Sequence, residues 1–249
     1  MNNTDKFTGK ASIYARFRPD YPQLLLDDLL LHPSAQFTVA DIGSGTGILT
    51  RQLLDRGVKV IAVEPNEDMR TAAETSLSAY SQFTSVSGNA EHTQLPDHCA
   101  DLVTVAQAFH WFDVNDFKKE CCRILKPDQK VALIWNSRIP NAPLIKETAK
   151  ICKTFCPNFR GFSGGIDGDR SSFLRFFRDG EYSVKTYSHP LRYTLDAFIG
   201  RHLSASYAPK PDDASRQPFV QALTELFSRY EQNGAVSFPN ETRCYYGCV

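Results

Sequence analysis

The sequence predicts an α/β fold, in which a mostly parallel sheet carries helices on both of its faces. Two observations predict it. Apolar stretches of strand length alternate with stretches of helical periodicity through the first half of the 249-residue chain. A glycine-rich loop, VADIGSGTGILT at residues 39–50, joins the first apolar stretch to the first helical one. Alternation of this kind is typical of βαβ units, which place parallel strands side by side through right-handed crossovers.

The first half of the chain contains five predicted strands and three predicted helices. The strands are apolar runs, and the helices repeat apolar residues every three or four positions. One helix follows the glycine loop and ends at Gly57, and another stops before Pro127, as helix-terminating residues require. The predicted strands cover residues 37–42, 58–64, 83–88, 100–108 and 130–135, and the predicted helices cover residues 47–57, 66–80 and 114–126.

The pattern is looser on either side of this core. One or two short helices, interrupted at Pro19 and Pro22, are predicted within residues 12–31. We find no repeat or linker, so we expect one domain over residues 1–249, made of an N-terminal helical lid (1–35), a core (36–136) and substrate-side insertions with C-terminal strands (137–249). After the core the sequence predicts a helix at 144–155, a strand at 181–194, an amphipathic helix within 215–234 and a last strand at 241–249.

Charge and cysteine content limit the classes of partner. Lysine plus arginine and aspartate plus glutamate both number 28, so the formal net charge is zero, and we expect neither nucleic acid nor a membrane surface as partner. We find no apolar leader and no apolar run of about 18 residues, so we expect a cytoplasmic protein. The seven cysteines form no paired C-x-x-C pattern, so we expect reduced thiols and no metal. A monomer or a homodimer fits these observations.

The glycines of the loop predict a ligand site. Gly43, Gly45 and Gly47 follow the first strand, and Asp41 precedes them. Ligands of open parallel sheets bind at the carboxyl ends of the strands, and glycine lets the backbone approach them closely. A dinucleotide fingerprint would need a third glycine at Ile48, and a Walker phosphate loop would need a following G-K-[ST]. Neither is present.

Glu64 stands at the end of the second strand, in VEPNEDM. A carboxylate at that place can accept hydrogen bonds from both hydroxyls of a ribose. Together with the glycine loop, Glu64 therefore indicates a nucleoside with free 2′ and 3′ hydroxyls. The alternative, an acid near a helix N-terminus without a ligand, stays open for Glu64 taken alone.

The chain resembles a known family at VADIGSGTG, VEPNEDM, GNAEHTQLPDHCADLVTVAQAFHWFD and RILKPDQKVALIW. These stretches are similar to the class I S-adenosylmethionine (SAM)-dependent methyltransferases, and within them to the type 11 or 25 small-molecule branch that includes the trans-aconitate methyltransferases. The resemblance implies a Rossmann-like, doubly wound sheet of seven mostly parallel strands with the last strand antiparallel. It covers residues 11–135 strongly and the rest weakly, and it departs from the family at KPDQ, where K-P-G is usual.

The resemblance also implies a SAM site in the core. The loop residues Asp41, Gly43, Ser44, Gly45 and Gly47 would hold the methionine part, and Glu64 would hold the ribose. The remaining implied cofactor residues are Asn89, Ala90 and Glu91 at the adenine, Pro65 and Met69 lining the adenine pocket, and Gln107 facing the sulfonium.

The acceptor is predicted to be a small molecule methylated at oxygen, because the segment AQAFHWF after the fourth strand lacks the [DNS]-P-P-[YF] motif of amine methylation. His110 is either a general base or a histidine that only shapes the pocket. Asp113 is expected to cap a helix rather than bind a metal. The arginines of RSSFLRFFRDG are expected on a short helix whose phenylalanines pack on the sheet. The candidate acceptor-binding residues are Phe109, His110 and Trp111 in an aromatic wall, Tyr14, Arg18 and Tyr21 on the lid, and Arg18, Arg138 and Arg201 as carboxylate clamps that are alternatively ordinary surface arginines.

Three alternatives stay open at this point. The chain could be a module that binds SAM or its product S-adenosylhomocysteine (SAH) without turnover, because the reaction requires few chemically active residues. It could be a nucleotide-dependent oxidoreductase, against which Ile48 argues, or an RNA methyltransferase, against which the zero net charge argues.

Overall fold

The computed structural model describes residues 18–31, 34, 36–162, 170–205 and 207–249. At its centre lies a seven-stranded sheet in the order β3-β2-β1-β4-β5-β9-β6. The strands β1 to β5 are parallel, and the last strand, β9, lies antiparallel between β5 and β6. The predicted fold class is confirmed. The strands of this sheet are β1 Thr38–Ile42, β2 Lys59–Val63, β3 Phe83–Val86, β4 Ala100–Ala106, β5 Leu125–Arg138, β6 Ser183–Ser188 and β9 Asn240–Gly247.

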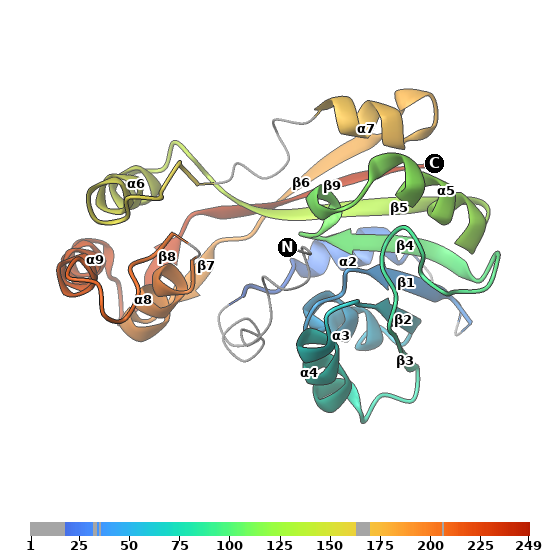
Figure 1. Cartoon of the computed structure of the whole chain (residues 1–249), viewed down its shortest axis with the longest axis horizontal. Coiled ribbons are helices and arrows are strands. Elements are labelled where there is room, and N and C mark those ends of the chain that lie inside the picture. Colours follow the sequence, from blue (N-terminus) through green and yellow to red (C-terminus); the bar gives the residue numbers. More distant parts are fainter. Residues whose placement is uncertain (1–17, 32–33, 35, 163–169, 206) are drawn as a thin grey trace.

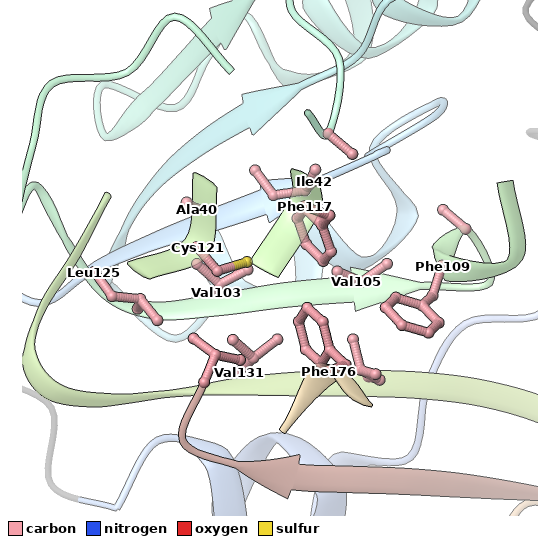
Figure 2. Close-up of a cluster of buried hydrophobic side chains, with 14 of the residues drawn as sticks. Ala40, Ile42, Val103, Val105, Phe109, Phe117, Cys121, Leu125, Val131 and Phe176 are labelled. Atoms are coloured by element: carbon pink, nitrogen blue, oxygen red, sulfur yellow. The ribbon is translucent and has the colours of Figure 1, made fainter. Parts of the chain in front are cut away.

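Helices cover both faces of this sheet (Figure 1). One face packs against α2 (Gln23–Leu29), α3 (Ile48–Leu54) and α4 (Glu67–Leu77), and the other against α5 (Val114–Ile124) and α7 (Arg170–Phe176). Successive strand residues point to opposite faces, which is why both faces are apolar. Figure 2 shows the second face, where Val103 and Val131 of the strands meet Phe117 of α5 and Phe176 of α7.

A second unit, which we call the helical unit, has its own hydrophobic core. The long strands β5 and β9 extend from the sheet toward it (Figure 1). Within it β7 pairs antiparallel with β8, and α6 packs against α9. Its elements are α6 Pro143–Phe155, β7 Leu191–Tyr193, α8 Leu195–Leu203, α9 Arg216–Tyr230 and β8 Val236–Phe238.

The structure corrects two of the strands predicted from the sequence. The fifth strand starts at Leu125 rather than Lys130, because α5 ends at Ile124 and Leu125 already pairs with Ala100. The register shifts before Lys130, and Asp128 adopts a φ of 61°. Asp128 thus takes the left-handed backbone conformation that glycine usually supplies, so the departure from K-P-G remains local.

The predicted strand over residues 181–194 is two strands in two different sheets. β6 belongs to the central sheet and β7 to the helical unit, with Pro190 between them. Proline has no N–H to donate, so it ends the first ladder there. Neither α8 nor β8 was predicted from the sequence.

Two predictions about local structure are confirmed. Asp113 caps α5, since its carboxylate accepts hydrogen bonds from the N–H groups of Asn115 and Asp116. The phenylalanines of α7 pack on the sheet, with Phe173 only 2% exposed. All seven cysteines are free thiols. Among the described residues there is no cluster of metal-ligating side chains, and no helix is long and apolar enough to cross a membrane.

Candidate active site

The glycine loop connects β1 to α3 at the carboxyl edge of the sheet. All three glycines have positive φ, at 67°, 57° and 79° for Gly43, Gly45 and Gly47. A Cβ on Gly43 would lie 2.8 Å from the Cβ of Ala108, and one on Gly47 would lie 2.8 Å from Cδ1 of Leu77. A Cβ on Gly45 would meet no atom within 4 Å. Two glycines therefore serve packing, while the open face of Gly45 leaves the backbone accessible to a ligand.

Two hydroxyl groups of the same loop have no partner among the described residues. Oγ of Ser44 and Oγ1 of Thr46 are both buried and make no hydrogen bond. Buried polar atoms nearly always have partners, and an unpaired one costs about 1–3 kcal/mol. The two orphaned hydroxyls and the open face of Gly45 fit a polar ligand that lies along the loop.

Glu64 ties the end of β2 to the glycine loop. Its Oε2 accepts a hydrogen bond from the N–H of Gly45 at 2.9 Å, and its Oε1 accepts one from the N–H of Asn66 at 2.8 Å. The side chain is buried, and this burial raises the pKa of its carboxyl group. A carboxylate has about four acceptor positions, so Glu64 retains capacity for further donors such as ribose hydroxyls.

Asp41 faces inward, away from the open side of the loop. Its carboxylate is 1% exposed and accepts hydrogen bonds from the hydroxyls of Thr50 at 2.6 Å and Thr104 at 2.9 Å. These bonds join β1 to α3 and β4. Burial raises the pKa of Asp41 to about 6. Asp41 therefore positions the loop in this structure, and the contact with the methionine part of SAM stays a prediction.

The loop expected at the adenine follows β3. Asn89 turns onto its own loop, since its Oδ1 accepts from the N–H of His92 at 2.7 Å. Ala90 is buried in the core, and Oε1 of Glu91 accepts from the N–H of Asp113 at 2.8 Å. This bond links the loop to the start of α5. The other two residues predicted for the adenine pocket differ in burial, Pro65 being exposed and Met69 buried.

Gln107 follows β4 and has a left-handed backbone. Its φ is 61°, an uncommon value for a residue other than glycine. The conformation is held by bonds from its N–H to the carbonyl of Ile134 and from its Nε2 to the carbonyl of Asn136. Such strain is a frequent property of functional sites.

The aromatic segment after β4 divides into a buried part and an exposed part. Phe109 is 1% exposed, and its ring packs against those of Phe173 and Phe176, so we remove it from the predicted acceptor wall (Figure 2). His110 and Trp111 lie at the surface with ring centroids 4.6 Å apart. Desolvation lowers the pKa of His110, so its ring is neutral at pH 7.

The three residues predicted on the lid differ in position and burial. Tyr14 lies outside the described residues, and Arg18 is exposed. Tyr21 is 6% exposed and packs in the core, where its backbone exchanges hydrogen bonds with Gln52, so we remove it from the acceptor site. α2 packs on the sheet as a structural layer, with Leu25 fully buried. The prediction of a lid is thus left to the residues before 18.

The two remaining arginines come together at the boundary with the helical unit. Arg138 ends β5 and Arg201 lies on α8. Burial, and then the charge of Arg201, lowers the pKa of Arg138. Tyr193, Tyr207 and His202 lie within electrostatic reach of both arginines. These three residues were not predicted from the sequence, because nothing in their local pattern separates them from core residues.

The comparison with known proteins identifies the core. Residues 40–133 match the family model described as a methyltransferase domain, and this span contains the glycine loop, Glu64 and Gln107. The core of the chain is therefore similar to a methyltransferase domain.

The chain is also similar to proteins described as methyltransferases. An uncharacterized methyltransferase of Mycobacterium bovis is 37% identical over 145 residues, which are 58% of this chain and 58% of that protein. An uncharacterized methyltransferase-like protein of Schizosaccharomyces pombe is 32% identical over 143 residues, which are 55% and 54% of the two chains. The matches therefore span less than two thirds of these relatives.

Solved structures share the fold across nearly the whole chain. A candidate type II methyltransferase from Anaeromyxobacter dehalogenans superposes with a TM-score of 0.68 at 21% identity, covering 93% of this chain and 96% of that one. At this level of identity the likeness concerns the fold.

Proposed function

We propose that this chain binds SAM along the glycine loop and transfers its methyl group to an oxygen atom of a small-molecule acceptor. The observation that carries the proposal is the open face of Gly45, flanked by the orphaned hydroxyls of Ser44 and Thr46 and by the carboxylate of Glu64. The methyltransferase domain match supports it. The finer resemblance to trans-aconitate methyltransferases stays a prediction.

In the proposed reaction the chain mainly binds and orients. The cofactor would supply a methyl group that its positive sulfur has already activated. Glu64 would hold the ribose hydroxyls, and Ser44 and Thr46 would bind polar groups beside the Gly45 backbone. An in-line displacement needs the acceptor atom about 3–3.5 Å from the methyl carbon, so positioning and exclusion of water supply most of the rate.

The role of His110 distinguishes two kinds of acceptor, a hydroxyl and a carboxylate. Its neutral ring can accept the proton of a hydroxyl acceptor, whereas a carboxylate acceptor arrives ionised and needs no base. If His110 is a base, His110→Ala lowers turnover by two or more orders of magnitude, and wild-type activity falls at low pH with an apparent pKa below 6.5. If the acceptor is a carboxylate, the loss is under about tenfold and the profile has no such step. Trp111→Ala should impair use of either acceptor while leaving SAH affinity within about threefold.

A matched pair of glycine substitutions tests the cofactor site. Gly45 and Gly57 both have positive φ and open space around a new Cβ, but Gly57 follows α3, away from the loop. Both alanine variants carry the same backbone strain, so they should lose similar stability. Titration calorimetry with SAH should show weaker binding for Gly45→Ala alone. Equal SAH affinity in the two variants would contradict the proposed site, and SAH binding without product formation from any acceptor would indicate a module without turnover.

A further inference from the structure

Three polar side chains surround one buried ring where the sheet meets the helical unit. The ring of Phe238, on β8, has the guanidinium of Arg138 5.9 Å from its centroid. The ring of Tyr193 lies 5.7 Å from the same centroid, and that of His202 lies 6.0 Å from it. Arg138 also lies over Phe162, at 4.3 Å. The cluster therefore combines aromatic rings with polar groups, the kinds of side chain that line small-molecule sites.

Each of the three polar side chains has a buried atom without a partner. These atoms are Nε of Arg138, the hydroxyl of Tyr193 and Nε2 of His202, and none makes a hydrogen bond within the described part of the chain. Tyr193 is 8% exposed and His202 is 1% exposed. Nδ1 of His202 lies 2.7 Å from the carbonyl of Phe198, to which it must donate, so Nε2 carries a free lone pair. Three orphaned groups around one ring indicate a ligand rather than a packing defect.

The cluster is positively charged and holds no acid. The groups whose charges act on Arg138 are Arg201, Tyr207, Tyr193 and Cys152, and no aspartate or glutamate of the described residues pairs with it. Burial, and then the charge of Arg201, lowers the pKa of Arg138 to about 10, so it stays protonated at pH 7. A buried guanidinium that pairs with no acid of the described residues favours an anionic ligand.

The cluster lies beyond the same edge of the sheet as the glycine loop, the edge at which the parallel strands end. Ile134 of β5 pairs with Ala106 at the end of β4, next to Gln107. Arg138 comes four residues later on the same strand, about 13 Å further along at roughly 3.3 Å per residue. The backbone of Arg138 therefore lies beyond the carboxyl edge of the sheet by about the length of a small molecule.

We propose that Arg138, with the hydroxyl of Tyr193, binds the carboxylate of the methyl acceptor, so that the substrates are carboxylic acids with an apolar body. The identification of the bound anion as the methyl acceptor rests on the proposed methyl transfer. The existence of an anion site at Arg138 does not depend on it. Arg138 would bind the carboxylate through parallel N–H donors, and Phe162 and Phe238 would pack against the apolar body.

Matched acids and amides test this assignment. The probes are benzoate, phenylacetate and succinate, each compared with its neutral amide at equal ionic strength and with saturating SAH. The wild type should bind at least one acid about tenfold or more tighter than its amide, because the amide loses the charge-assisted bonds. Arg138→Met should abolish this preference. The control Arg160→Met, which changes an exposed arginine outside the cluster, should retain it.

The outcomes separate this proposal from the one on which it rests. Equal binding of acid and amide for all three pairs, or an acid preference that survives Arg138→Met, would overturn it. Tighter binding of phenyl phosphate than of benzoate would replace the carboxylate with a phosphate. Without any ligand, Arg138→Met should melt no lower than the wild type, because it removes an uncompensated charge, and a clear loss would show that the guanidinium has a structural role instead. Acid binding together with no SAH binding would leave the anion site standing and reject the methyl transfer.

Discussion

The carboxyl edge of the sheet and the helical unit differ in how their buried ionisable groups are paired. At the sheet edge the buried acids are bonded by the chain itself, Asp41 by two threonine hydroxyls and Glu64 by two backbone N–H groups. In the helical unit the cluster around Phe238 contains buried atoms that the described chain leaves without partners. The buried acids of the cofactor edge are thus held in place before any ligand binds, and the unpaired hydroxyls of Ser44 and Thr46 beside them keep bonding capacity for one. In the helical unit the buried guanidinium of Arg138 pairs with no acid of the described residues.

The largest expected effect concerns the glycines that only pack. Gly43→Ala forces a left-handed alanine and a Cβ 2.8 Å from Ala108, so it should lower the free energy of unfolding by about 3 kcal/mol. Gly45→Ala carries the backbone cost alone, roughly 1 kcal/mol. Urea unfolding of both variants measures the difference. Equal losses would mean that the loop relaxes freely and is not preformed.

Asp41 should make the sheet less stable as the pH rises. Its pKa is about 6 in the folded chain and 3.8 in the unfolded one, so between these values the folded state holds the proton that the unfolded state has lost. This contribution is present below pH 3.8 and is lost as the pH rises through 6, by about 2 kcal/mol between pH 4 and pH 7. Asp41→Asn should remove it. A stability difference between wild type and variant that stays constant with pH would contradict the buried, threonine-bonded carboxylate.

His202 should make the helical unit less stable as the pH falls, which is the opposite of the effect expected for Asp41. Burial lowers its pKa to about 3, against 6.5 in the unfolded chain, so the unfolded state binds the extra proton as the pH falls. The contribution of His202 to the free energy of unfolding is therefore fully present above pH 6.5. It should decline by about 2 kcal/mol between pH 7 and pH 5. His202→Phe keeps the ring packing against Phe238 and should abolish the decline. Unfolding curves of the variant at the two pH values provide the check, and an unchanged decline would place the titrating group elsewhere.

The two regions also differ in how far the sequence predicts them. The glycine loop and Glu64 lie within one short segment, and the spacing of adjacent strands and helices places them at the same edge, so local pattern was sufficient. The burial of Asp41 and Phe109 was not predicted, because a residue near a site can point inward or outward and only the packed core decides which. Phe109 is held by rings from α5, β5 and α7, elements that are far apart in the chain.

The helical unit lacks such a local signal. Arg138, Tyr193, His202 and Phe238 come from four elements spread over 100 residues, and β7 pairs with β8 across the whole of α8 and α9. Arg138 was a candidate on chemistry alone, by its guanidinium. Its neighbours depend on long-range pairing, which periodicity does not encode.

The most direct test of the proposed cofactor site is calorimetric titration of SAH into Glu64→Ala, beside wild type and the control Glu67→Ala. Glu67 is an exposed acid in the first turn of α4, three residues further on. If Glu64 holds the ribose, its removal takes the charged acceptor from two hydroxyls, and affinity should fall at least about tenfold while Glu67→Ala binds like the wild type. Circular dichroism would confirm that both variants are folded. An unchanged dissociation constant in folded Glu64→Ala would contradict the account.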